Sequence, residues 1–266
     1  MANIIGLQMH TLRRELAAAK EPLDVYRKVK AAGYDAVQAK LSHNLSPKDL
    51  KKILDDVGLK PLSLSGNDFG HLLGILKDPK HAIESAHALG VSVLDVGTVF
   101  IENRNTLNGY QLYANLINEA GKLVRKEGLK ISYHNHALEF HNFEGGCTGM
   151  DVLADETDPD ILNFCLDCHW LQGAGANQIQ WIKRLTGRMT MIHLKDYGID
   201  LGTTVVEVTP RIFKAVGEGN IHWEPIIAAA KEAKIDIYVV EQDECDRDPF
   251  DCIASSSRYM KNTLGL

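Results

Sequence analysis

The chain has 266 residues, of which 45% are hydrophobic and 24% are charged, and its formal net charge is −6. This is the composition of a globular protein with a core. The negative charge argues against a nucleic-acid partner, and no apolar stretch approaches the roughly 20 residues that a membrane span needs. A chain of this length suits one (β/α)8 barrel of about 250 residues, so we expect a single barrel domain over residues 1–266.

The first residues run directly into an apolar segment, without the charged leader and long apolar region of a signal peptide. The cysteines are odd in number, which argues against a disulfide framework. Cys165 and Cys168 lie near a predicted strand end, but we interpret them as buried thiols rather than metal ligands. These features predict a reduced, cytoplasmic protein with no membrane partner.

Apolar strand candidates alternate with helix-period segments along the chain. A strand at 4–8 is followed by a helix that ends at Gly33, and a short strand follows at 36–38. Ser46 and Pro47 then predict the start of a helix that ends at Gly58. The remaining strands are predicted at 61–65, 91–96, from 131, and at 161–166, 189–194 and 237–240, with helices around 78–89, 112–124, 179–185 and 226–233.

Eight alternations of strand and helix predict a parallel sheet. A strand–helix–strand unit needs about 30 residues, so eight units fit this length and close most simply into a (β/α)8 barrel. The alternative is a doubly wound open sheet. We disfavour it because residues 9–13 (MHTLR) follow the first strand where a glycine-rich phosphate turn would be expected.

Ionisable residues follow the last four predicted strands. In a barrel the carboxyl ends of all strands open on one face, so residues far apart in sequence converge there. The set that we expect at this face is His134, His136, Glu139, Asp167, His193 and Glu241.

Carboxylates and imidazole around one point suit a divalent ion such as Mn²⁺, Co²⁺, Mg²⁺ or Zn²⁺. One acid at a strand end is more commonly a helix cap or a solvated loop residue, and one histidine is more commonly a hydrogen-bonded core residue. The recurrence at four successive strands is what favours a metal site.

The sequence resembles the xylose isomerase-like TIM-barrel superfamily, in particular its sugar phosphate isomerase/epimerase branch. The likeness covers the whole chain and is carried by YHNHALEF (133–140), LDCHWLQGAG (166–175), IHLKD (192–196), GEGNIHW (217–223) and VVEQD (239–243).

The resemblance implies one divalent ion bound by Asp167, His193, Glu241 and an acid on the fifth strand. Similar ketose epimerases carry that acid on the strand itself, where this sequence has His134 or His136. We therefore expect Glu139 to reach in from the following loop as the fourth metal ligand, with a histidine ligand as the alternative.

Such an ion would hold neighbouring sugar oxygens and stabilise the enediolate formed when the proton next to a carbonyl leaves. The residues expected to move that proton are Glu139, Glu241 and His136. Those expected to contact the substrate are His134, His169, Trp170 and Lys195. For Trp170 the alternative is packing of a helix, and for Lys195 it is a surface pair with Asp196.

The leading functional prediction is a metal-dependent isomerase or epimerase acting on a small sugar. The alternative within the same chemistry is a hydratase or lyase acting on 3-keto-sugars or 3-keto-glycosides. An endonuclease IV-like repair enzyme would need three zinc ions and a DNA-binding surface, and a non-catalytic sugar binder would keep only the pocket. Homo-oligomerisation stays open. Further candidates for substrate contact follow earlier strands, namely His10, Gln38, Asn67 and His71.

Overall fold

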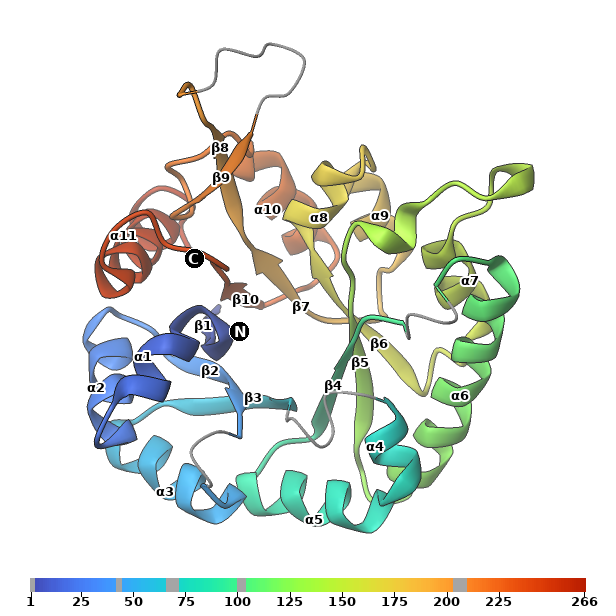
Figure 1. Ribbon diagram of the computed structural model, residues 1–266, viewed down its shortest axis with the longest axis horizontal. Helices are drawn as coiled ribbons and strands as arrows, with labels where there is room; N and C mark the ends of the chain where they lie inside the picture. Colours follow the sequence, from blue (N-terminus) through green and yellow to red (C-terminus); the bar gives the residue numbers. More distant parts are fainter. Residues whose placement is uncertain (1–2, 42–44, 66–71, 100–103, 203–209) are drawn as a thin grey trace.

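The computed structural model describes residues 3–41, 45–65, 72–99, 104–202 and 210–266. These residues form a closed barrel of parallel strands in the order β1-β10-β7-β6-β5-β4-β3-β2 (Figure 1). The predicted (β/α)8 barrel is confirmed, and the open-sheet alternative is wrong. The barrel strands are β1 (Ile4–Gln8), β2 (Ala36–Lys40), β3 (Lys60–Ser65), β4 (Val93–Gly97), β5 (Lys130–His134), β6 (Leu162–Asp167), β7 (Met189–Leu194) and β10 (Ile237–Val240).

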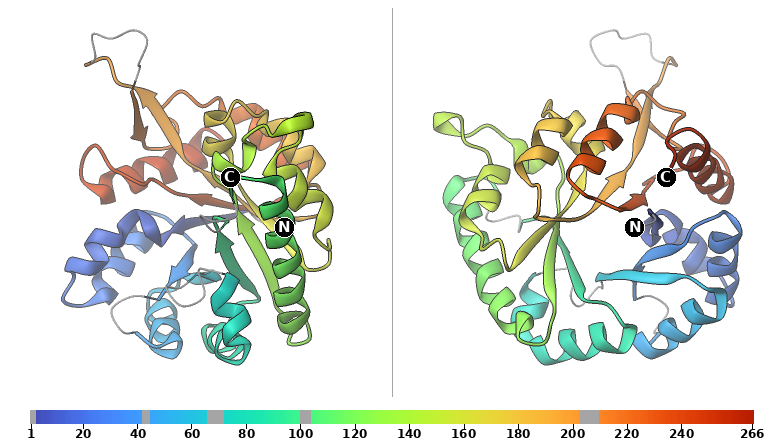
Figure 2. Two further views of the ribbon diagram at one scale, coloured as in Figure 1. Left: turned by 45° about the vertical axis from the view of Figure 1, so that its right-hand side comes forward. Right: turned by 180° about the vertical axis from the view of Figure 1, so that it is seen from behind.

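Helices surround the barrel on its outer side in both views (Figures 1 and 2). The helix predicted after Ser46 is α3 (Pro47–Val57), where the Ser46 hydroxyl caps the Asp49 amide and Gly58 ends the helix at a φ of 72°. That left-handed conformation favours glycine. The other helices are α1 (Arg13–Ala18), α2 (Pro22–Ala31), α4 (Leu72–Lys77), α5 (Pro79–Leu89), α6 (Leu107–Arg125), α7 (Gly149–Glu156), α8 (Cys168–Gly173), α9 (Gln178–Arg184), α10 (Trp223–Glu232) and α11 (Pro249–Asn262), with 3-10 turns η1 (Met9–Leu12), η2 (Leu138–Phe140) and η3 (Glu144–Gly146).

Side-chain alternation along the strands separates a large apolar core under the helices from an inward face that is apolar around Cys165, Met191 and Val239 and polar toward the carboxyl ends of the strands. On β5, the Tyr133 ring packs edge-on against Tyr113 of α6, with 6.2 Å between ring centroids. The Ser132 hydroxyl instead lies 3.0 Å from the Thr190 hydroxyl of β7, a strand that does not neighbour β5 in the barrel. Even-numbered residues of β5 therefore face the barrel interior, which places His134 there as well.

A hairpin stands apart from the barrel. Strand β8 (Asp196–Ile199) pairs antiparallel with β9 (Arg211–Lys214), and the pair projects beyond the ends of β7 and β10 (Figure 1). This hairpin lies between the predicted strand at 189–194 and the predicted helix around 226–233. Across the described residues, each helix is too short or too polar to cross a membrane.

Candidate metal centre

Four side chains from consecutive strands converge inside the carboxyl end of the barrel. One ligand atom from each of His134, Asp167, His193 and Glu241 lies within 4.8 Å of the other three, and among the described residues this is the group that could hold a metal ion. The Nε2 atom of His134 lies 3.1 Å from Asp167 Oδ2, and the Nδ1 atom of His193 lies 3.0 Å from Glu241 Oε2. The structure thus brings together three of the four predicted ligands and adds His134.

The two oxygens of Asp167 have different partners. Oδ1 accepts hydrogen bonds from the backbone amides of His169 (2.9 Å) and Trp170 (3.1 Å) and so caps helix α8. Oδ2 faces the imidazole of His134. The cap fixes the carboxylate, because rotating it would leave the first amides of α8 without an acceptor. The predicted alternative of a helix cap is therefore true of one oxygen, while the other is directed into the cluster.

Lys195 lies beside this cluster. Its Nζ atom is 3.0 Å from Glu241 Oε2, 3.1 Å from Asp243 Oδ2 and 3.6 Å from Asp167 Oδ2, and the residue is buried. The alternative of a surface pair with Asp196 is wrong. Asp196 faces the other way, where its carboxylate accepts hydrogen bonds from Gly217 N, Gly219 N and Ile221 N.

The electrostatics of the cluster favour ionised acids. Burial by itself raises the pKa of Asp167, but the Lys195 charge and the hydrogen bond from His134 outweigh it, so the pKa lies well below its usual range. Burial likewise works to raise the pKa of Glu241, and Lys195 and His193 bring it well below the usual range. Burial works to lower the pKa of His193, but Cys165, Asp167 and Glu241 raise it well above its usual value, so an ion bound here would displace the His193 proton. With both imidazoles then neutral, Asp167, Glu241 and Asp243 against one ammonium would leave two negative charges.

The donor set fits a divalent ion. Two imidazole nitrogens and two carboxylate oxygens suit Zn²⁺, Mn²⁺ or Co²⁺, and two positive charges would balance the local excess of negative charge. The other buried ligand-type side chains nearby do not join this group. Cys165 and Cys168 are buried free thiols, and burial raises the pKa of both, so their interpretation as inert thiols agrees with the structure.

Glu139 is placed differently from the expectation that it reaches the metal. It is buried in η2, where Oε1 accepts a hydrogen bond from the Tyr133 hydroxyl (2.6 Å) and Oε2 accepts one from the His136 amide (2.8 Å). Since Tyr133 points to the outer helices, its partner Glu139 is held on that side of the strand. Glu139 is therefore not part of the group formed by His134, Asp167, His193 and Glu241, and the alternative of a histidine from the fifth strand is the one that agrees with this geometry. The expected part of Glu139 in proton transfer stays a prediction.

His136 follows the end of β5 rather than lying on the strand. Its ring centroid is 4.8 Å from that of His134 and 5.6 Å from that of Trp170, so the two imidazoles face the same space as predicted. Burial, followed by the neighbouring His134, lowers the pKa of His136 to about 3. The Thr98 hydroxyl lies 3.5 Å from His136 Nδ1, and Thr98 has a φ of 63°, a conformation that non-glycine residues rarely adopt and that recurs at functional sites.

The two aromatic residues after Asp167 differ in burial and contacts. His169 is buried and stacks on Phe213 of β9 with 5.2 Å between centroids, so it ties helix α8 to the hairpin. Trp170 is half-buried and lies over the Lys195 ammonium, 5.1 Å from the ring centroid. Of the expected substrate contacts, Trp170 and Lys195 flank the cluster, whereas His169 is engaged in packing.

A cavity of about 490 Å³ opens onto the cluster. Its lining includes His134, His136, Lys195 and Glu241. Residues from the early strands also line it, among them Gln8, His10, Gln38, Lys40, Asp95 and Thr98. Gln38 and His10 were predicted at the substrate face, whereas Asn67 and His71 lie outside the described residues. Gln8, Lys40 and Asp95 were not predicted at this face, although polar residues that alternate with apolar ones in a strand indicate an inward-facing position.

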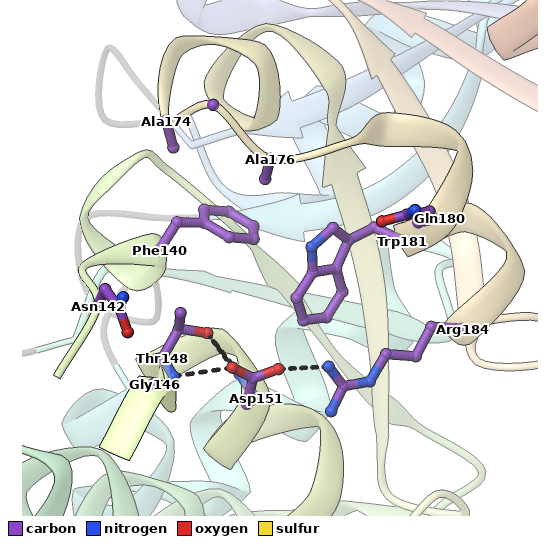
Figure 3. A pocket seen from close by; sticks show the side chains of 11 residues that line it. Phe140, Asn142, Gly146, Thr148, Asp151, Ala174, Ala176, Gln180, Trp181 and Arg184 are labelled. Carbon is purple, nitrogen blue, oxygen red and sulfur yellow. Dashed lines mark hydrogen bonds and ion pairs between the residues drawn. The ribbon is translucent and has the colours of Figure 1, made fainter. Parts of the chain in front are cut away.

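A second cavity, of about 440 Å³, lies outside the barrel between η2, α7 and α9 (Figure 3). Its wall includes Phe140 and Trp181, whose rings meet edge-on at 5.4 Å between centroids. Its charged groups pair with one another, since Arg184 binds Asp151, which also accepts the Thr148 amide at 2.8 Å. The predicted site residues His134, His136, Lys195 and Glu241 line the cavity inside the barrel and not this one.

A closed parallel barrel places this chain among the TIM-barrel proteins, and the cluster at the carboxyl ends of its strands consists of side chains that commonly bind metal ions. A family model described as the xylose isomerase-like TIM barrel matches residues 26–263. The chain belongs to this family, which confirms the resemblance seen in the sequence.

The curated relatives are named inosose dehydratase. The protein from Geobacillus thermodenitrificans is 27% identical over 162 residues, which is 56% of this chain and 53% of that protein, so this match spans about half of the relative. The protein from Lacticaseibacillus casei is 23% identical over 269 residues, covering 88% of this chain and 87% of that protein. These relatives indicate an enzyme, and they favour the predicted hydratase or lyase alternative over the isomerase or epimerase.

Solved structures share the fold. A sugar phosphate isomerase/epimerase from Parabacteroides distasonis superimposes with a TM-score of 0.79 at 22% identity, covering 99% of this chain and 95% of that one. An IOLI protein with a binding zinc atom superimposes with a TM-score of 0.72 at 18% identity, covering 98% of each chain.

Proposed function

We propose that this protein is a divalent-metal-dependent dehydratase that removes water from a hydroxylated ring ketone, either a keto-cyclitol or a 3-keto-sugar. The observation that carries the proposal is the convergence of His134, Asp167, His193 and Glu241 within 4.8 Å of one another beside a cavity. The curated relatives named inosose dehydratase support the reaction type, and the zinc-containing IOLI structure supports a divalent ion.

His134, Asp167, His193 and Glu241 would hold the ion. When bound, it would supply Lewis-acid polarisation of a substrate carbonyl, which makes the hydrogen on the neighbouring carbon more acidic. The protein must then provide a group that accepts this proton, a group that protonates the departing hydroxyl, and a cavity that limits access of bulk water.

His136 is the proposed proton acceptor. It lines the cavity, and burial lowers its pKa, which keeps the imidazole unprotonated at neutral pH. Such a weak base depends on the carbonyl polarisation that the ion would supply. Lys195 also lines the cavity, and burial works to lower its pKa, but Glu241, Asp167 and Asp243 raise it overall. The resulting ammonium is placed to stabilise negative charge that develops on a substrate oxygen.

The test is a product analysis in deuterated water. Purified protein loaded with Mn²⁺ or Zn²⁺ is incubated with inosose, with 3-keto-glucosides and with free ketoses. Loss of one water from the ring ketone, detected by mass, is the expected result. A His193→Gln variant is the matched control and should lose turnover. Epimerised product that carries solvent deuterium, without loss of water, would show an isomerase instead.

A further inference from the structure

Asp95 is a buried acid of β4 at the wall of the cavity inside the barrel. It lies between Leu94 and Val96, which are buried in the apolar core, so the alternation along the strand directs Asp95 to the interior. The next residue on the same side is Gly97, which also lines the cavity. Because Gly97 has no side chain, the space beyond Asp95 stays open toward His134 and His136, whose atoms lie 3.7–3.9 Å from where a Cβ atom of residue 97 would be.

The two oxygens of Asp95 are unequal. Oδ2 accepts a hydrogen bond from Gln38 Nε2 at 2.9 Å and a second from the Ser63 hydroxyl. Oδ1 is buried and has no hydrogen-bond partner among the described residues. A buried polar atom without a partner is uncommon in a folded protein and calls for an explanation. Since Oδ2 already receives two donors, a proton on this acid belongs on Oδ1, where no described residue accepts it.

The surroundings favour the neutral acid. The buried carboxylates Asp167 and Glu241 lie beside the Lys195 ammonium, whereas no ion pair involves Asp95 in the described part of the chain. Burial raises the pKa of Asp95, and the hydrogen bond from Ser63, the charge of His193, the hydrogen bond from Gln38 and the charge of His134 only partly offset this. Asp95 therefore favours the protonated form, which suits a proton donor, whereas Asp167 and Glu241 favour the ionised form, which suits a metal ligand.

Gln38 connects Asp95 to the cluster. Its Nε2 donates to Asp95, while its Oε1 accepts from Gln8 Nε2 at 3.1 Å and contacts His193 Nε2. These partners fix which end of the amide faces the acid, because only the NH₂ group can donate to Asp95. Gln38 thus links the acid to His193, a candidate metal ligand.

We infer that Asp95 is the general acid that protonates the departing hydroxyl, an inference that rests on the proposed dehydration. His136 takes the proton from the carbon next to the carbonyl, and a carbon–carbon double bond forms as the β C–O bond breaks. The electron pair of that bond leaves with the oxygen, which takes the Asp95 proton and departs as water. Asp95 ends as a carboxylate and His136 as an imidazolium, and proton exchange with solvent restores both.

The variant Asp95→Asn tests this step. The amide oxygen of an asparagine can still accept hydrogen bonds from Gln38 and Ser63. Its NH₂ group, however, is not acidic enough to protonate the departing hydroxyl. Dehydration should fall by about 10²–10⁴-fold, the usual contribution of a general acid. Exchange of the proton next to the carbonyl with deuterated water should persist. Elimination from a β-fluoro analogue should also persist, since fluoride leaves without protonation. Ser63→Ala, which removes one hydrogen bond but keeps the acid, should have a much smaller effect.

Two outcomes would overturn the inference: dehydration by Asp95→Asn at the parent rate, or loss of deuterium exchange together with dehydration. If the parent protein dehydrates none of the ketones, the proposed function fails. Infrared difference spectroscopy can still test, independently of activity, whether Asp95 is protonated. A carboxylic acid band at neutral pH that is present in the parent and missing in Asp95→Asn supports a stored proton. Absence of that band in the parent contradicts it.

Discussion

His134 Nε2 lies 3.1 Å from Asp167 Oδ2, so a histidine at the end of β5 faces the acid at the end of β6. Glu139, five residues further along the chain, is bonded instead to the hydroxyl of Tyr133 and to the amide of His136. We therefore propose different tasks for the two residues, namely metal ligation for His134 and support of the loop for Glu139.

Replacing each residue should separate these tasks. His134→Ala should weaken Zn²⁺ or Mn²⁺ binding by more than the roughly 10–100-fold that loss of a supporting partner of a ligand costs. Glu139→Gln should bind the ion like the parent but lose about 1–3 kcal/mol of stability. The reason is that the NH₂ group of glutamine would face one of the two buried donors, the Tyr133 hydroxyl or the His136 amide. Chelator competition and urea unfolding measure the two effects. The assignment is wrong if Glu139→Gln loses the ion while His134→Ala keeps it.

The sequence predicts the barrel and most of the cluster because both follow from alternation. Strand β7 has the predicted bounds, and His193 lies on its inward face. Lys195 follows the strand directly, two residues after His193, so the same two-residue rule would have placed it inside the barrel, where a pairing with its neighbour Asp196 was considered instead. The rule fails where the chain leaves the extended conformation. The chain after His134 turns into η2, so spacing alone cannot tell which way Glu139 points.

Lys195 should contribute more to the free energy of unfolding of the metal-free protein than to that of the metal-loaded protein. Lys195→Met keeps an apolar stem but leaves Asp167, Glu241 and Asp243 without their ammonium partner. Breaking a buried ion pair costs about 3–5 kcal/mol, and a divalent ion would recover part of this by neutralising Asp167 and Glu241. Saturating Mn²⁺ should therefore raise the unfolding free energy of the variant more than that of the parent.

Asp243→Asn is the comparison for that experiment. The side chain of Asp243 is 24% exposed, so its loss should cost less than loss of Lys195. An ion that stabilises Lys195→Met no more than the parent would argue against binding next to this ammonium.

Asp196 should hold the connection between the hairpin and α10 in one conformation. Its buried carboxylate accepts the amides of Gly217 (3.0 Å), Gly219 (3.3 Å) and Ile221 (3.2 Å), besides the Trp223 indole NH (2.9 Å). In Asp196→Asn an NH₂ group replaces one acceptor oxygen, and each donor left unpaired costs about 1–3 kcal/mol. These amides should exchange with deuterium faster. Asp200→Asn, which alters the acceptor of the Gly202 amide, should leave them unchanged. Equal exchange in both variants would exclude this role.

Asp151 should make the link between α7 and α9 sensitive to acid. Its carboxylate caps α7 by accepting the Thr148 amide at 2.8 Å, and it pairs with Arg184 of α9 (Figure 3). Burial works to raise the pKa of Asp151, but the hydrogen bonds from Thr148 and Arg184 outweigh it, so the pKa is lowered on folding. The folded protein therefore holds this proton less tightly than the unfolded chain, whose Asp titrates at about 3.9.

The stabilisation is consequently present above that pH and is lost as the pH falls through the lower pKa of the folded state. At neutral pH, Asp151→Asn should cost about 0.5–2 kcal/mol, the usual contribution of such a cap. The difference between parent and variant should shrink as the pH falls below about 4. Asp155→Asn also removes a partner of Arg184, but the Asp155 side chain is 68% exposed, so at most about 1 kcal/mol is expected. Urea unfolding across this pH range measures both variants, and a pH-independent difference for Asp151→Asn would contradict the lowered pKa.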